Sequence, residues 1–306
     1  MRALVTGITS FHGEHIANEL VKEGYEVHGL LRHVAHRDFQ LDGVTMHKGD
    51  IRDYDSMIDI VTEVNPQLIV HLAAQSPVEY SFTHEQEVMD VNYLGTFNLA
   101  RAASKYLKSL QKFTLASSVE TYGNQPVLPL REDMAPNPAS PYGVAKVAAE
   151  TYIRYLSRGY GFPGIILRTA NTYGRSKTDY FVVERIIHQM LMGKKEINLG
   201  LPYPIRDFLY VDDELTAYMA LIKSNTVKFG ETFNTGTGVG ISIEHLFNKL
   251  KSKIGSDAKP IWRTNSPRPY EINNLTVDYK KLYNATGWSP QYDLDTGLSK
   301  TIKKWQ

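Results

Sequence analysis

The stretch ALVTGITSFHGEHIANEL, residues 3–20, decides the fold. Its first apolar run ends at Gly7, and an amphipathic run of good helix formers starts near Gly13. A glycine turn between a strand and a helix lets backbone N–H groups approach the phosphates of a dinucleotide. Ser10 stands where this pattern usually has its second glycine, and its small side chain is compatible with close approach. We therefore predict that a dinucleotide contacts Gly7, Thr9, Ser10 and Gly13, the alternative being an ordinary strand-to-helix turn.

Short apolar runs and amphipathic stretches alternate through the first half of the chain, and after about residue 170 the pattern loosens into a mixed set. Strands separated by helices of about ten to fifteen residues indicate βαβ units and a parallel sheet. We predict an α/β fold: a Rossmann-type, doubly wound parallel sheet over residues 1–170, and a smaller mixed C-terminal substrate domain over residues 171–306 with some segments that return to the Rossmann core. The strand candidates are residues 3–7, 25–31, 67–74, 113–116 and 164–167. The helix candidates are residues 14–24, 55–66, 88–106, 142–158, 180–193, 214–223 and 242–255.

Composition argues against several classes of protein. The 34 basic residues nearly cancel the 33 acidic ones, so the sequence does not indicate a nucleic-acid binder. The absence of cysteine excludes disulfides, thiol catalysis and thiolate metal sites. No apolar run approaches the roughly 20 residues of a membrane helix, and glycine interrupts the first residues too early for a signal peptide. We expect a cytoplasmic protein that binds no membrane and needs no metal, with His12 and His15 as ordinary loop and helix residues.

The ends of the later strand candidates predict further cofactor contacts. The second candidate ends in Arg32, with no acidic residue there to hydrogen-bond a ribose 2′-hydroxyl. A positive charge at this place suits a 2′-phosphate, so we predict NADP, with NAD as the second choice. The alternative for Arg32 is a solvent-exposed surface arginine. Small or apolar residues at the end of the 67–74 strand candidate would let the cofactor lie against the sheet edge; these are Leu72, Ala73 and Ala74.

Tyr142 and Lys146 are four residues apart in PYGVAKVAAETYIRYL, so both project from one face of the predicted helix. A tyrosine has an ordinary pKa of about 10 and needs a nearby cation to act as a base near neutrality. Lys146 would supply that cation, together with an oxidised nicotinamide. Ser118, at the end of a strand candidate, would hydrogen-bond the same substrate hydroxyl. This spacing recurs by chance, and the glycine loop upstream is what favours a catalytic interpretation.

Together these features resemble the extended short-chain dehydrogenases/reductases of the NAD-dependent epimerase/dehydratase family, over essentially all 306 residues. The resemblance implies a catalytic set of Ser118, Tyr142 and Lys146, and adenine contacts from Asp50 and Ile51. The runs GYEVHG, AAQS and QSPVEYSF are most similar to GDP-mannose 4,6-dehydratases and GDP-4-keto-6-deoxymannose reductases, which use NADP.

The same resemblance implies a nucleotide-diphosphate sugar as substrate. Its contacts would fall on Ser76, Asn171, Arg206 and Arg268. Two arginines suit a diphosphate because the guanidinium fork matches phosphate oxygens. A surface ion pair is the alternative for each arginine taken singly.

Glu120 distinguishes the branches of the family. It lies two residues after Ser118, where the resemblance to dehydratases implies a glutamate that removes the sugar C5 proton. Simple 4-epimerases usually have a small or apolar residue at this place. Val119 departs from dehydratases that carry an aspartic acid there, so Glu120 would serve as both base and acid, or water would assist.

The resemblance therefore implies a 4,6-dehydratase that oxidises C4, eliminates water across C5 and C6, and returns the hydride. Three other reactions use the same catalytic set: 4-keto-sugar reduction, uronate decarboxylation and 4-epimerisation. The reductases that this chain resembles are similarly short and can also carry a glutamate at the position of Glu120. A length of 306 residues is short for a GDP-mannose dehydratase. An NADP-sensing protein without turnover is the alternative outside the enzymes, although such proteins often lose the tyrosine or the lysine.

The resemblance also implies a homodimer built on the helices at residues 88–106 and 142–158. Their apolar side chains recur at helical spacing and would either form a four-helix bundle with a second copy or pack on the sheet. These side chains are Leu94, Leu99, Ala102, Ala148, Tyr152 and Tyr155.

Overall fold

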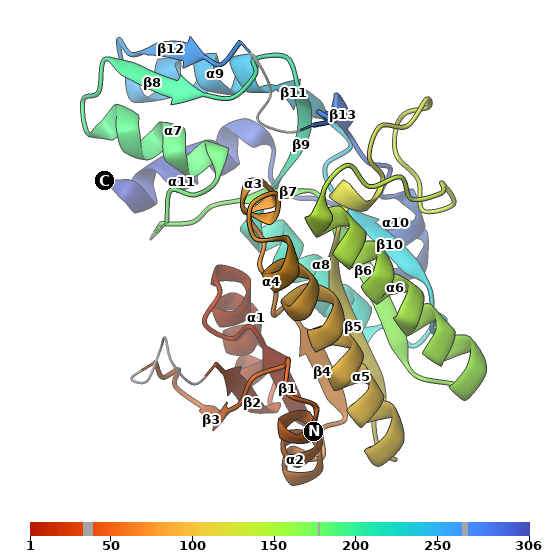
Figure 1. Ribbon diagram of the computed structural model, residues 1–306. Coiled ribbons are helices and arrows are strands. Elements are labelled where there is room, and N and C mark those ends of the chain that lie inside the picture. The colour runs from red at the N-terminus through yellow and green to blue at the C-terminus, as the bar shows by residue number, and fades with distance from the viewer. Residues whose placement is uncertain (33–38, 177, 265–268) are drawn as a thin grey trace. The chain divides into compact units, whose positions relative to one another are not determined.

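Seven strands hydrogen-bond side by side in the computed structural model, which describes residues 1–32, 39–176, 178–264 and 269–306 (Figure 1). Their order is β10-β6-β5-β4-β1-β2-β3. β1 pairs in parallel with β2 and β4, and the parallel direction continues to β3 and β5. The strands are β1 (Arg2–Thr6), β2 (Glu26–Leu31), β3 (Val44–Lys48), β4 (Leu68–His71), β5 (Lys112–Ser118), β6 (Gly164–Thr169) and β10 (Thr232–Thr235). The predicted Rossmann-type α/β fold is confirmed.

The chain runs outward from β1 to β3 and then returns to place β4 on the other side of β1. In open α/β sheets, ligands bind outside the carboxyl ends of the strands where the order reverses. The reversal between β1 and β4 therefore marks the place where a cofactor site belongs. Gly7 directly follows the end of β1, and Leu72 directly follows the end of β4.

Helices cover the sheet because their apolar faces match its apolar strands. α2 (Tyr54–Val64), α5 (Gly95–Tyr106) and α6 (Pro141–Tyr160) share one buried cluster with side chains of the central strands. α5 and α6 run alongside one another in Figure 1. Leu99 and Ala102 lie in this cluster and are fully buried, so they pack on the sheet and do not form an outer surface. Leu94 and Tyr155, in contrast, are exposed.

The helix expected over residues 88–106 is observed and begins earlier, at Glu85, with one π-helical turn inside it. It consists of α4 (Glu85–Met89), a π-helical turn at Asp90–Leu94 and α5. π-helical turns inside helices often occur at functional sites because they change the direction of side chains. This turn carries Asn92, which has a role at the candidate site described below.

Contacts divide the chain into two compact units. The first contains residues 1–118, 141–168 and 218–233, and the second contains residues 119–140, 169–217 and 234–306. In the second unit β9 (Ile205–Tyr210) pairs with β7 (Asn171–Tyr173), β11 (Gly240–Ser242) and β13 (Asn274–Leu275), and β8 (Glu196–Leu199) pairs with β12 (Lys259–Trp262). Its other elements are a 3₁₀ turn at Val119–Thr121, α7 (Val182–Leu191), α9 (Ile243–Ile254), α10 (Lys280–Thr286) and α11 (Leu294–Trp305).

Three further helices complete the described parts of the chain. α1 (Phe11–Lys22) and α3 (Val78–Ser81) belong to the first unit, and α8 (Val211–Lys223) begins in the second unit and ends in the first. Within the described residues, no helix is long and apolar enough to cross a membrane.

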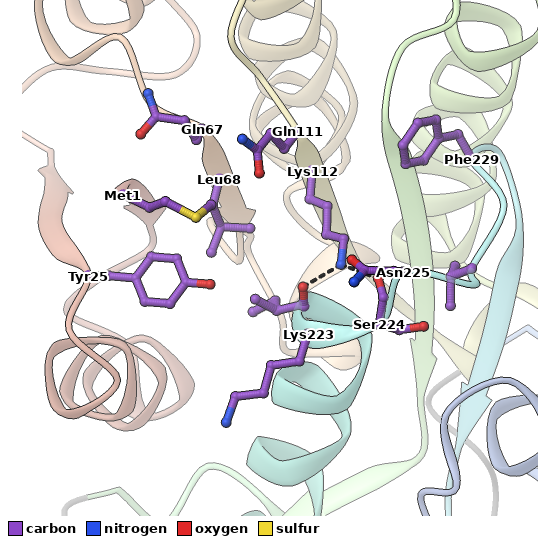
Figure 2. A pocket seen from close by; sticks show the side chains of 12 residues that line it. Met1, Tyr25, Gln67, Leu68, Gln111, Lys112, Lys223, Ser224, Asn225 and Phe229 are labelled. Carbon is purple, nitrogen blue, oxygen red and sulfur yellow. Dashed lines mark hydrogen bonds between the residues drawn. The ribbon is translucent and has the colours of Figure 1, made fainter.

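A cavity of about 390 Å³ lies at the amino ends of the strands of the first unit, among residues that include Met1, Leu68 and Lys112 (Figure 2). The Lys112 ammonium donates hydrogen bonds to the carbonyl oxygens of Leu221, Ile222 and Ser224, so it caps the C-terminus of α8. A cation at this end of a helix is favourable because the last carbonyls have no partners within the helix. The cavity lies at the sheet edge opposite the strand reversal and takes no part in the candidate site.

Candidate functional site

The loop from β1 to α1 is shaped for a close approach by a ligand. Gly7 has φ +70°, and a side chain there would place its Cβ 2.7 Å from the Ala73 nitrogen. A Cβ at Gly13 would lie 2.2 Å from the Gly7 carbonyl oxygen. Ser10 caps α1, because its Oγ accepts a hydrogen bond from the Gly13 N–H at 3.0 Å. Both glycines are therefore required, and the loop fits a pyrophosphate at the helix N-terminus.

The carboxyl ends of β1 and β4 are joined by a buried polar chain. Thr6 Oγ1 lies 2.7 Å from His71 Nδ1, and His71 Nε2 lies 2.9 Å from Thr96 Oγ1. The Ala73 N–H donates to Thr6 Oγ1 at 3.3 Å. Burial, followed by the charge of Lys146, lowers the pKa of His71 to about 3, so its ring is neutral. These hydrogen bonds hold Leu72, Ala73 and Ala74 at the sheet edge where the cofactor contacts were predicted.

Two asparagines that the sequence analysis missed hold the loops of this edge. Asn92 Oδ1 accepts a hydrogen bond from the Gln75 N–H at 2.8 Å, and Asn92 Nδ2 donates to the Gln75 carbonyl at 3.0 Å. Asn98 Nδ2 donates to the carbonyls of Ile51 and Arg52 at 3.1 and 2.9 Å. Both asparagines are buried inside a predicted helix, where an amide is costly without partners. An asparagine on the apolar face of a predicted helix was therefore the signal in the sequence that could have identified them.

The expected adenine contacts lie on a loop after β3. Ile51 is buried, and the Asp50 carboxylate is held by the Arg52 guanidinium at 2.6 to 3.0 Å. The hydrogen bond from Arg52 lowers the pKa of Asp50, and Arg32 adds a smaller effect in the same direction. Arg32 directly follows β2 and is exposed. His33, His36 and Arg37, which the sequence places next to it, lie outside the described residues.

Ser118, Tyr142 and Lys146 all belong to the first unit. Ser118 ends β5, and the other two lie in the first turns of α6. Tyr142 and Lys146 are 7% and 3% exposed, and the Lys146 ammonium lies 5.7 Å from the centroid of the Tyr142 ring. Lys146 Nζ donates to the Ala116 carbonyl at 2.7 Å, which ties α6 to β5. Burial lowers the pKa of Lys146 to about 8, so a cation and a neutral amine are both accessible near neutral pH.

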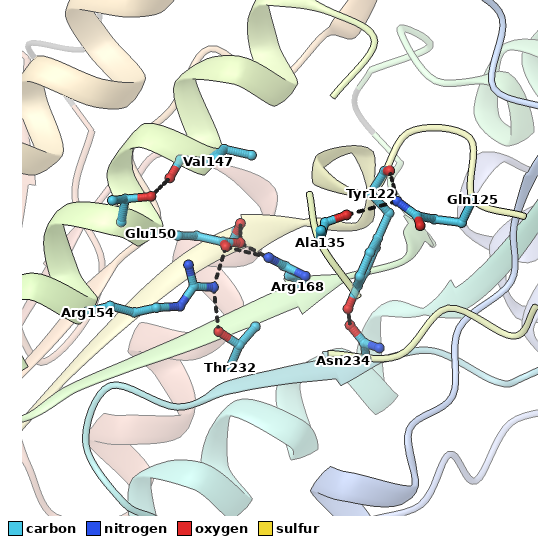
Figure 3. A network of polar contacts seen from close by, with 11 residues as sticks. Tyr122, Gln125, Ala135, Val147, Glu150, Arg154, Arg168, Thr232 and Asn234 are labelled. Atoms are coloured by element: carbon cyan, nitrogen blue, oxygen red, sulfur yellow. Dashed lines mark hydrogen bonds and ion pairs between the residues drawn. The ribbon is translucent and has the colours of Figure 1, made fainter. Parts of the chain in front are cut away.

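A buried carboxylate one turn beyond Lys146 joins α6 to the neighbouring strands (Figure 3). Glu150 accepts hydrogen bonds from Ser117 Oγ at 2.5 Å, Arg168 Nε at 2.9 Å, Arg168 Nη2 at 2.6 Å and Arg154 Nη2 at 2.7 Å. Burial raises the pKa of Glu150, but the arginines outweigh burial and hold the pKa below its usual range. Glu150 is therefore a permanent anion that fixes α6 against β5 and β6.

Glu120, Asn171 and Arg206 belong to the second unit. Glu120 lies in the 3₁₀ turn and is only 7% exposed. Asn171 is on β7, and its Oδ1 is buried without a hydrogen-bond partner in the described structure. Arg206 is on β9, where its Nη2 donates to Glu271 Oε1 at 3.0 Å.

The other two predicted substrate contacts are Ser76 and Arg268. Ser76 is exposed on the loop after β4 in the first unit. Arg268 lies outside the described residues. No group of three or more histidine, aspartate or glutamate side chains in the described parts of the chain is arranged to hold a metal ion.

The chain is similar to known proteins over nearly its whole length. The sequence model of the family described as GDP-mannose 4,6 dehydratase matches residues 4–301. A putative UDP-glucose 4-epimerase of Methanocaldococcus jannaschii is 33% identical, over 98% of this chain and 96% of that protein. The dTDP-glucose 4,6-dehydratase 1 of Escherichia coli is 29% identical, over 99% of this chain and 92% of that protein. A solved UDP-glucose 4-epimerase of Thermus thermophilus, in complex with NAD, has a TM-score of 0.89 at 29% identity and covers 100% of this chain and 99% of its own.

Proposed function

Because the chain belongs to the NAD-dependent epimerase/dehydratase family of nucleotide-sugar enzymes, within the extended short-chain dehydrogenases/reductases, we propose that it is a nucleotide-sugar 4,6-dehydratase. The observation that carries this proposal is the buried Glu120, two residues after Ser118. Burying a carboxylate costs free energy, so a buried carboxylate is expected where the group has a chemical or structural role. A dehydratase needs a base for the C5 proton in addition to the tyrosine, whereas a 4-epimerase does not.

In the proposed mechanism Tyr142 removes the proton of the sugar O4, and Ser118 holds that hydroxyl in line. The Lys146 ammonium stabilises the Tyr142 phenolate, which has to form below its ordinary pKa. The loop with Gly7, Ser10 and Gly13 would hold the dinucleotide, whose nicotinamide would supply the hydride acceptor for C4 and the hydride donor for C6. The 4-ketone acidifies C5–H, and Glu120 takes that proton and delivers it to the C6 hydroxyl, which leaves as water. When the hydride returns to C6, C5 takes up a new proton and Tyr142 releases the one it took from O4, so the net change is the loss of one water. Such general acid and base groups are each worth about 10² to 10⁴ in rate.

We propose that the second unit binds the nucleotide-diphosphate sugar, with Asn171, Arg206 and Arg268 as contacts. The unpartnered Asn171 Oδ1 and the burial of Arg206 support this role for the two described residues. GDP-mannose is the favoured substrate because of the runs quoted above and the match to the family model. Ser76 would contact the sugar from the first unit.

A 4-epimerase is the second candidate. It is favoured by the similarity to proteins named UDP-glucose 4-epimerase, one at 33% identity in sequence and one with a TM-score of 0.89 in structure. Ser118 and Tyr142 suffice for that reaction, and Glu120 would then have no chemical step.

One experiment separates these candidates. The purified protein is incubated with GDP-mannose, UDP-glucose, dTDP-glucose and CDP-glucose, with and without added NADP, and product masses are followed. We expect one of these sugars to lose one water without net change of the cofactor. Unchanged mass with altered sugar stereochemistry would reject the dehydratase and establish the epimerase. A 4-keto-sugar reductase or a uronate decarboxylase would turn over none of these four sugars, because they have neither the ketone nor the carboxylate that those reactions need.

We propose NADP as the cofactor because exposed Arg32 follows β2, where a 2′-phosphate would lie. The similar epimerase with bound NAD makes NAD the alternative. Replacing Arg32 with alanine should weaken NADP binding about 10- to 100-fold, the value of a lost charge-assisted hydrogen bond, and leave NAD binding within about twofold. Fluorescence titration of both cofactors measures this, and an equal effect on both would reject the assignment.

We also propose a homodimer. Leu94 and Tyr155 are exposed on the helices that cover one face of the sheet, and large exposed apolar side chains in a patch mark interaction sites. Sedimentation of the protein and of Tyr155→Glu should show a dimer that the charge converts to a monomer. A monomeric wild-type protein would contradict the proposal.

A further inference from the structure

The turn that carries Glu120 is fixed by contacts that the proposed mechanism does not use. The Tyr122 N–H donates to the Val119 carbonyl at 3.1 Å, which closes the turn around Glu120. Gly123 follows with φ +59°, and a Cβ there would lie 1.7 Å from the Asn137 carbonyl oxygen. The Asn137 N–H donates to the Thr121 carbonyl at 3.1 Å. The backbone on both sides of Glu120 is thus held in place.

The side chain of Tyr122 ties this turn to one asparagine. Tyr122 and Asn234 are both fully buried, and the tyrosine hydroxyl donates to Asn234 Oδ1 at 2.7 Å (Figure 3). A buried hydrogen bond of this length removes the freedom of the tyrosine ring to shift, because a lost bond would leave the amide oxygen unsatisfied.

Three further hydrogen bonds hold Asn234 in place. Its Nδ2 donates to the carbonyls of Leu130 and Asp278 at 3.0 and 3.2 Å, and its backbone N–H donates to Glu132 Oε1 at 2.8 Å. One residue of β10 therefore fixes three points of the segment 119–140, at Tyr122, Leu130 and Glu132. All of these residues belong to the second unit.

We propose that the hydrogen bond between Tyr122 and Asn234 is the positioning element that aims Glu120 at the sugar C5 proton, an inference that rests on the proposed dehydratase function. Neither residue would touch the substrate. A small displacement of a general base weakens proton transfer steeply, and a misplacement of about 1 Å costs about 10²-fold. The oxidation at C4 uses Ser118, Tyr142 and Lys146, so it should not depend on this bond.

The variant Tyr122→Phe removes only the hydroxyl, and Tyr173→Phe is its matched control. Tyr173 is also buried in the second unit, where its hydroxyl lies 3.5 Å from the Leu294 carbonyl, away from the segment 119–140. GDP-mannose is the probe, or whichever of the other three nucleotide-hexoses the wild-type protein turns over. Two rates are measured in deuterium oxide: nicotinamide reduction in a single turnover, and deuterium incorporation at C5.

We expect Tyr122→Phe to lower the rate of C5 exchange and kcat by about 10- to 100-fold, with nicotinamide reduction and KM within about threefold of wild type. Tyr173→Phe should leave both rates within about threefold, and Glu132→Gln should give a smaller loss of the same kind as Tyr122→Phe. An equal loss of both rates in Tyr122→Phe, or no loss, would overturn the positioning role. Absence of C5 exchange in the wild-type protein would reject the dehydratase proposal and this inference together.

Discussion

Replacing Lys146 with methionine should abolish activity and stabilise the folded protein at neutral pH. Lys146 is 3% exposed, and burial lowers its pKa from the ordinary 10.5 to about 8. Since one pKa unit is worth about 1.4 kcal/mol, a charged Lys146 costs the fold about 3 kcal/mol at pH 7. Methionine removes that cost but leaves the Ala116 carbonyl without its 2.7 Å donor, a loss of about 1 to 3 kcal/mol. The expected net gain at pH 7 is up to about 2 kcal/mol.

The pH dependence tests this reasoning more sharply than the net value. The cost is present in full below pH 8 and disappears as the pH rises towards 10.5, because the unfolded chain then still holds the proton that the folded lysine has lost. Wild-type stability should therefore rise by about 1 kcal/mol relative to Lys146→Met between pH 7 and pH 9. Urea unfolding at the two pH values measures this, with the exposed Lys108→Met as control. A difference between wild type and Lys146→Met that does not change with pH would refute the argument.

Three further predictions concern buried groups and the glycine loop. Burial raises the pKa of Glu214 from 4.5 to about 7, so the fold loses stability as pH rises through that range. Glu214→Gln should raise the free energy of unfolding by about 2 to 3 kcal/mol at pH 8 and hardly at pH 4.5, and equal thermal shifts at both pH values would contradict this. Glu150→Leu should lower the free energy of unfolding in urea by about 3 to 5 kcal/mol, because it leaves the buried Arg168 guanidinium without its anion. The control Asp257→Ala breaks an exposed ion pair and should lower it by at most about 1 kcal/mol. Gly13→Ala should abolish cofactor binding in a fluorescence titration, since its Cβ would meet the Gly7 carbonyl, and Gly159→Ala, with nothing within 4 Å, should bind normally.

Local pattern was enough to predict much of the fold. The alternation of apolar strands and amphipathic helices is a short-range property, and it placed β1, α1, β2, α2 and β4 close to their observed bounds. The two glycines of the loop likewise lie only six positions apart. The same holds for Tyr142 and Lys146, whose spacing puts them on one helical face before any tertiary contact is known.

The contacts that surround the site could be learned only from the tertiary structure. Glu150 binds Ser117 and Arg168, which are 33 and 18 residues away in the chain. Asn92 meets Gln75 from a π-helical turn that periodicity predicted as ordinary helix. Tyr122 and Asn234 are 112 residues apart in the chain. A single sequence records the local period of each segment, which follows from backbone geometry, but not which segments pack together. That choice depends on how all the apolar surfaces and buried polar groups are satisfied at once.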